Sequence, residues 1–145
     1  PMSRANPQFN HDALSTALAE VQIAYEHVAA LGGLRGRVPA LPPQVNGLWQ
    51  NRSFHNYADY ALSDAFHAGL EHLRTEGHRW RCAMMCAEAV WWRCHRSMVS
   101  DYLKAKGWTV LHIMATGKAE EHTYTSPARI VGDRVFYSDE NLFNL

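Results

Sequence analysis

Within residues 81–96, two thiols, a carboxylate, an imidazole and two guanidinium groups are predicted to meet. Cys86 and Glu88 come first, and Cys94, His95 and Arg96 follow a pair of tryptophans. The apolar pattern predicts that Cys86 ends a buried strand and that the Cys-His-Arg run lies in the first turn of a helix. Because α/β proteins place chemistry where a strand leads into a helix, this stretch is the predicted functional site.

The two cysteines are the candidate nucleophile or redox pair. The free N–H groups of a helix N-terminus, together with Arg93, His95 and Arg96, would stabilise a thiolate at Cys94 and lower its pKa. The alternative is that Cys94 is a small buried residue that packs the helix onto the sheet. Cys86 has the same alternative, because it alternates with apolar residues along its strand.

Glu88 is predicted to act as a general acid or base, with the imidazole of His95 as a second titratable group. A carboxylate just after a central strand is costly to bury alone, so an ion pair with an arginine is the structural alternative. The residues predicted to hold an anionic ligand through guanidinium or hydroxyl groups are Arg93, Arg96, Arg35 and Tyr57.

Spacing argues against two familiar uses of cysteine. Six residues, an acid among them, separate Cys86 from Arg93, which is too many for the anion-binding loop of tyrosine phosphatases. A metal held by Cys86, Cys94, His95 and His112 would lack the paired spacing typical of zinc sites. We therefore predict neither a metal nor another cofactor.

Composition limits the possible partners. The chain has 145 residues, with 14 basic and 14 acidic side chains and a net charge of zero when histidine is neutral. A broad attraction to nucleic acid or to an anionic membrane is therefore not expected. The odd number of cysteines indicates a reducing compartment. No apolar run approaches the roughly 18 residues that cross a bilayer, so we expect a cytoplasmic protein.

The elements that position these residues are predicted to alternate. Helical spacing predicts helices over residues 10–22, 56–76 and 93–106. Apolar runs predict strands over residues 23–28, 80–86 and 108–114. A glycine- and proline-rich loop covers residues 32–53, and a small C-terminal β-hairpin covers residues 130–137. This order predicts a single α/β domain over residues 1–145, with a mostly parallel central sheet flanked by helices on both faces.

Several short motifs are spread along the chain: Leu-Gly-Gly at residues 31–33, Met-Cys-Ala-Glu at 85–88, Cys-His-Arg at 94–96 and His-Ile at 112–113. Through them the chain resembles, over nearly its whole length, a bacterial family known as domain of unknown function 488. The resemblance implies an α/β fold with the Cys-Glu-Cys-His-Arg cluster as its centre, and it supplies no established reaction. Family members usually begin with a further strand, helix and strand, so the resemblance implies a fragment or a shortened member. The open sheet edge that would result favours a homodimer.

Two functions remain open, and with them the question of whether the protein is an enzyme. The first is an enzyme-like domain that binds a small anionic or nucleotide-type ligand at the carboxyl end of the sheet. The alternative is a non-enzymatic nucleic-acid or protein-binding module, in which Trp80, Trp91 and Trp92 stack on bases and the cluster is structural. Turnover that is lost on changing Cys94 or Glu88 would favour the enzyme, and steep salt dependence of binding would favour the module.

Overall fold

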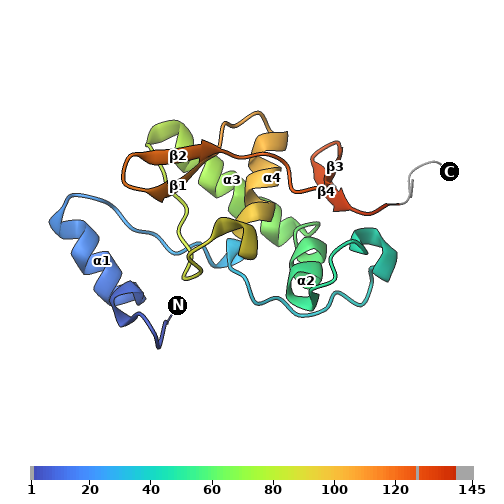
Figure 1. Ribbon diagram of the computed structural model, residues 1–145, viewed down its shortest axis with the longest axis horizontal. Helices are drawn as coiled ribbons and strands as arrows, with labels where there is room; N and C mark the ends of the chain where they lie inside the picture. Colours follow the sequence, from blue (N-terminus) through green and yellow to red (C-terminus); the bar gives the residue numbers. More distant parts are fainter. Residues whose placement is uncertain (1, 127, 140–145) are drawn as a thin grey trace.

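Two helices that pack against each other, α3 (Asp64–Arg79) and α4 (Arg96–Ala105), form the centre of the protein (Figure 1). A computed structural model describes residues 2–126 and 128–139 of the chain. Seven of the ten residues of α4 are buried, and the ring of its Tyr102 lies 4.9 Å from that of Phe66 on α3. Because α4 is buried along most of its length, the residues that precede and follow it in the sequence are held in position.

The single helix predicted over residues 56–76 is two helices, α2 (Arg52–Tyr60) and α3. The side chain of Asn51 caps α2 by accepting from two backbone N–H groups. Ser63 caps α3 in the same way and starts a new helix after a short turn. The apolar spacing continues through the turn, which is why the pattern predicted one helix.

The N-terminal helix is confirmed as α1 (His11–Glu20), which follows a short 3-10 turn, η1 (Pro7–Phe9). None of the residues of α1 is buried, and the helix lies apart from the core (Figure 1). The strand predicted over residues 23–28 is wrong, because this segment has no strand partner within the described residues. The segment leads instead to a second 3-10 turn, η2 (Ala29–Leu31), which packs against α3.

The predicted parallel sheet is also wrong. The described residues form two separate antiparallel pairs: β1 (Leu111–Ala115) with β2 (Lys118–Glu121), and β3 (Ala128–Val131) with β4 (Arg134–Tyr137). The second pair is the predicted C-terminal hairpin, turning through Gly132 at a positive φ of 61°. Alternating helical and extended patterns indicate a parallel sheet only if the extended segments pair with one another, and here they do not.

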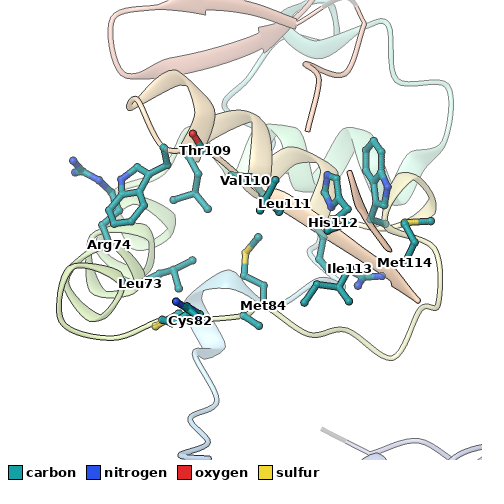
Figure 2. A pocket seen from close by; sticks show the side chains of 18 of the residues that line it. Leu73, Arg74, Cys82, Met84, Thr109, Val110, Leu111, His112, Ile113 and Met114 are labelled. Atoms are coloured by element: carbon teal, nitrogen blue, oxygen red, sulfur yellow. The ribbon is translucent and has the colours of Figure 1, made fainter. Parts of the chain in front are cut away.

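The segment over residues 80–86 is extended but belongs to no strand. It lies opposite β1 across a cleft of about 520 Å³. Figure 2 shows Leu73, Cys82 and Met84 on one side of this cleft and Val110, Leu111 and Ile113 on the other. The prediction found extended backbone at both places, but a cleft takes the place of the expected ladder.

The loop predicted over residues 32–53 contains one short 3-10 helix, η3 (Pro43–Asn46). The buried Asn46 fastens it to two other elements. Its Nδ2 donates to Oδ1 of Asp59 on α2 at 2.7 Å, and its Oδ1 accepts from the backbone N–H of Tyr137 on β4 at 3.0 Å.

Helices of the described chain are all too short or too polar to span a membrane.

Candidate functional site

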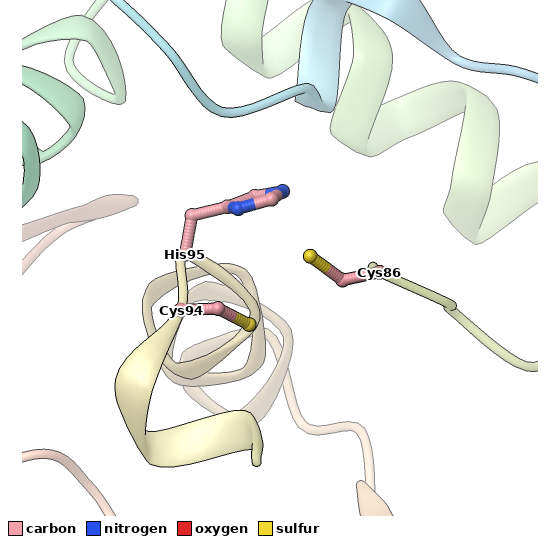
Figure 3. A group of neighbouring side chains, drawn as sticks. All are labelled: Cys86, Cys94 and His95. Carbon is pink, nitrogen blue, oxygen red and sulfur yellow. The ribbon is translucent and has the colours of Figure 1, made fainter. Parts of the chain in front are cut away.

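Three of the four predicted catalytic residues come together at the N-terminus of α4. The sulfur atoms of Cys86 and Cys94 and a ring nitrogen of His95 all lie within 4.8 Å of one another. Figure 3 shows that Cys86 arrives on the extended segment, whereas the other two lie where the chain enters α4. Two segments that lie close together in the sequence thus meet at one point.

The position of Cys94 differs slightly from the prediction. A short 3-10 turn, η4 (Trp91–Arg93), turns the chain, and Cys94 follows in extended conformation. His95 is the residue that precedes α4, so the thiol lies before the helix and not in its first turn. The sulfur of Cys94 accepts a hydrogen bond from the backbone N–H of Arg96 at 3.3 Å. Cys94 therefore does receive a free N–H of the helix end, as a capping side chain would.

Arg96 holds the cluster from the other side. Its Nε donates to Sγ of Cys94 at 3.0 Å, and its Nη2 donates to the backbone carbonyl of Glu88. The same side chain lines the cleft. The guanidinium therefore places a positive charge that contacts Cys94 and also borders the cleft.

The two thiols differ in acidity. A hydrogen bond from Cys94, helped by the backbone N–H of Glu88 and the nearby His95 and Arg96, lowers the pKa of Cys86 to about 5. The pKa of Cys94 is raised, first because its thiol donates to Cys86 and then because it is buried. We expect the pair to hold one proton at neutral pH, with the thiolate on Cys86.

The imidazole of His95 is enclosed by the Leu-Gly-Gly motif and α2. Burial lowers its pKa, so the ring is neutral at pH 7. A Cβ on residue 33 would lie 3.0 Å from Nδ1 of His95, which is closer than ordinary van der Waals contact. Glycine has no Cβ and therefore fits here. The ring of Tyr57 lies 5.0 Å away, and its hydroxyl donates to the carbonyl of Leu31 at 2.6 Å. Tyr57 thus packs the histidine while its hydroxyl is already bonded.

The other predicted residues are less closely engaged. Arg35 donates from Nε to the carbonyl of Gly32 at 3.0 Å and lies 3.9 Å from the ring centre of Tyr60, so it holds the loop in place. The side chains of Glu88 and Arg93 are exposed and have no polar partner within residues 2–126 and 128–139. Glu88 reaches the cluster only through its backbone.

Sequence analysis missed a second group of polar side chains, which is buried. His112 on β1 contacts His122, and His122 contacts Asp101 in α4, with distances of 2.8 and 2.7 Å. Asp101 stands among the apolar residues of its helix, between Ser100 and Tyr102. A carboxylate within an apolar helical stretch is costly to bury without partners, and that was the signal available in the sequence.

Cys86, Cys94 and His95 could together hold one soft cation such as Zn²⁺, with its fourth position left for a ligand. Neutral imidazole and a thiolate are the protonation states that such binding needs. The expectation that the protein uses no metal remains a prediction.

The structure thus defines a small helical protein with two antiparallel hairpins and a paired-thiol site at a helix N-terminus. The chain belongs to the family described as Domain of unknown function DUF488, whose sequence model matches residues 1–103. This range includes Cys86, Cys94, His95 and Arg96. Searches of curated proteins and of solved structures found no match.

Proposed function

We propose that the protein performs thiol chemistry on a small anionic ligand, with Cys86 as the reacting thiolate and Cys94 as its proton-sharing partner. The observation that supports this most directly is the 3.0 Å contact between the Arg96 guanidinium and Sγ of Cys94, beside a second sulfur of low pKa. A thiolate next to a fixed positive charge is the usual environment of a reactive cysteine.

Charge around the site favours an anion, including one of the nucleotide type. Arg93 is exposed next to the thiol cluster in sequence, and its guanidinium is free for a ligand among the described residues. The adjoining cleft is lined by Arg74, Arg81 and Arg96 and by no aspartate or glutamate of the described chain. An anion that enters past these arginines gains an electrostatic attraction that an uncharged ligand does not, and this attraction offsets the greater cost of removing water from the anion.

Glu88 is the proposed acid or base of this chemistry. Its carboxylate is exposed, and its backbone is already bonded to both Cys86 and Arg96. An exposed side chain is free to rotate towards a ligand, whereas these contacts hold the backbone. Glu88→Gln should therefore abolish turnover and leave stability unchanged.

The test uses two alkylating probes that differ in charge. Iodoacetate is an anion and iodoacetamide is neutral, and site-resolved mass spectrometry gives the rate of each at Cys86, first in the folded protein and then in the protein unfolded in urea as the reference. We expect the ratio of the iodoacetate rate to the iodoacetamide rate to be at least several-fold higher at Cys86 of the folded protein. Arg93→Gln should lower that ratio in the folded protein alone. Equal ratios in the folded and the unfolded protein would contradict the anion site.

Nucleic-acid binding is the alternative function. Trp91, one of the aromatic side chains considered for stacking on bases, already stacks on His112. The two ring centres lie 3.9 Å apart and the angle between the ring planes is 2°. Trp80 and Trp92 remain exposed. Binding of a fluorescent single-stranded oligonucleotide that weakens steeply between about 50 and 200 mM salt would support this alternative.

A second copy of the chain is the proposed protein partner. Leu111 and Ile113 of β1 are 58% and 75% exposed, which is unusual for such side chains on a strand that flanks a cleft. Light scattering after size-exclusion chromatography should show a dimer that Ile113→Lys disrupts. Val21→Lys, at an equally exposed position beyond α1, is the matched control. A monomer at all concentrations would contradict the dimer.

A further inference from the structure

The second polar cluster connects the core to the cleft. Asp101 is fully buried, His122 is 1% exposed and His112 is 8% exposed. Nε2 of His122 lies 2.7 Å from Oδ1 of Asp101, and Nδ1 of His122 lies 2.8 Å from Nε2 of His112. These contacts form one continuous chain from the middle of α4 to the wall of the cleft.

The donors around Asp101 determine where the protons lie. The backbone N–H of Thr125 donates to its Oδ1 at 2.9 Å, and the hydroxyl of Tyr137 donates to its Oδ2 at 2.7 Å. Burial and the adjacent carboxylate raise the pKa of Tyr137, so this hydroxyl keeps its proton. With these donors in place both carboxylate oxygens of Asp101 act as acceptors, and His122 donates to Oδ1 from Nε2.

Proton positions further along the chain then follow. A neutral His122 that donates from Nε2 carries a lone pair on Nδ1, so it accepts the Nε2 proton of His112. The remaining nitrogen of His112, Nδ1, is left unprotonated. It has no hydrogen-bond partner among the residues that the structure describes, and His112 lines the cleft.

The ring of His112 is held firmly. Trp91 stacks flat on it, and the indole Nε1 donates to Oε1 of Glu120 at 3.3 Å. Glu120 is the cross-strand partner of His112 in the β1–β2 pair. The ionisable groups that face His112 are His122, Glu120, Arg96 and Asp101.

We propose that Asp101, His122 and His112 form a proton relay that ends in the cleft, where Nδ1 of His112 accepts a proton from a bound ligand. The ligand would carry an ionisable O–H, N–H or S–H group, with its negative charge directed at Arg96, which lines the same cleft. His112 is the group that contacts the ligand, whereas Asp101 and His122 are positioning residues.

The proposed reaction moves one proton from the ligand into the relay. The ligand's X–H bond breaks, its electron pair stays on X, and the proton binds Nδ1 of His112. The Nε2 proton of His112 passes to Nδ1 of His122, so His112 ends neutral in its other tautomer. The positive charge then lies on His122, 2.7 Å from the Asp101 carboxylate. Burial lowers the pKa of His112, which keeps Nδ1 available as an acceptor at neutral pH.

The inference does not depend on the thiol chemistry, because its test concerns the imidazole alone. Diethyl pyrocarbonate acylates an unprotonated imidazole nitrogen, and acylation at Nδ1 of His112 needs the same shift of the Nε2 proton. Site-resolved mass spectrometry would measure its rate at His112, with the exposed His27 as the internal reference. We expect Asp101→Asn to slow acylation at His112 roughly tenfold, the factor for losing one charge-assisted hydrogen bond.

Two variants complete this experiment. His122→Asn keeps an acceptor near the Nδ1 position but cannot take up a proton, so it should slow His112 to a similar degree. Asp59→Asn removes a carboxylate that is also buried but contacts none of the three relay residues, and it should leave the rate at His112 unchanged.

A measurement on the unaltered protein keeps the inference falsifiable if a variant does not fold. Nitrogen-15 NMR of labelled histidine reports which ring nitrogen carries the proton. We expect Nε2–H and a bare Nδ1 on His112. A proton on Nδ1, an imidazolium at neutral pH, or equal acylation rates in the Asp101→Asn protein would each overturn the relay.

Discussion

Arg96 donates through Nε to Sγ of Cys94 at 3.0 Å, while its backbone N–H donates to the same sulfur at 3.3 Å. The sulfur thus receives two donors from one residue, one neutral and one charged. Since Arg96 also lines the cleft, we expect a charge bound there to change the acidity of the thiol pair.

The first prediction concerns this link. Arg96→Gln removes a positive charge that helps to lower the pKa of Cys86, so the pH at which Cys86 becomes reactive should move upward. The measurement is the pH dependence of iodoacetamide alkylation at Cys86. Arg52→Gln, an exposed position at the start of α2, is the control. An unchanged profile in the Arg96 variant would show that the guanidinium has no role in thiol acidity.

The second prediction concerns stability and pH. The folded pKa of Cys86 is about 5, whereas an unfolded cysteine titrates near ~8.5. A depressed pKa contributes stability that is fully present above the unfolded value and is lost as the pH falls through the folded value. The free energy of unfolding should therefore rise between about pH 5 and pH 8.5. The raised pKa of Cys94 acts in the opposite sense, and only above that window.

Urea unfolding of Cys86→Ser under reducing conditions measures this contribution. Its stability should rise less steeply with pH than that of the unaltered protein, whereas Cys82→Ser, at an exposed thiol, should change nothing. Histidines remote from Cys86 contribute equally to all three proteins and cancel in the comparison. His95, whose pKa is lowered by burial and raised by the Cys86 charge, is part of the measured effect. If the unfolding free energy of the unaltered protein and of Cys86→Ser changed with pH in parallel, Cys86 would titrate alike in the folded and the unfolded state.

The third prediction concerns the contact between Gly33 and His95. A Cβ at Gly33 would lie 3.0 Å from Nδ1 and 3.2 Å from Cε1 of the imidazole. Gly33→Ala must displace the ring, and we expect a loss of about 1–3 kcal/mol in the free energy of unfolding. Gly36→Ala is the matched control, because a Cβ there meets nothing within 4 Å. Chemical denaturation of both variants checks the prediction, which equal stabilities would contradict.

The fourth prediction concerns the buried Asn46. Its side chain satisfies both Asp59 and the backbone N–H of Tyr137. Asn46→Ala would leave Oδ1 of Asp59 and the backbone N–H of Tyr137 without a partner, so we expect it to cost about 2–4 kcal/mol of unfolding free energy. Gln44→Ala removes an exposed amide from the same 3-10 turn and should cost little. If the two variants were equally stable, Asn46 would not be what fastens the loop.

Local chemistry determined several features of this protein. The periodicity of α1, the buried stripe of α4 and the Gly-Asp turn of the C-terminal hairpin follow from propensities that act over a few residues. The thiol cluster was also within reach, because Cys94, His95 and Arg96 are adjacent and the chain needs only one turn to bring Cys86 to them. The family resemblance, which the match over residues 1–103 confirms, rests on the same short motifs.

Tertiary structure alone decided which extended segments pair. The residues around Met84 and those around Ile113 have the same apolar pattern that strands have, yet a cleft lies between them. Pairing depends on a partner backbone at the right distance, and no local pattern contains that information.

The relay needed tertiary structure for a similar reason. Asp101, His112 and His122 lie at least ten positions apart in the sequence, and only the packing of the β1–β2 hairpin on α4 brings them within hydrogen-bond distance. Sequence determines which groups are costly to bury, whereas the fold decides which partners satisfy them, because hydrogen bonds depend on positions in space and not on spacing along the chain.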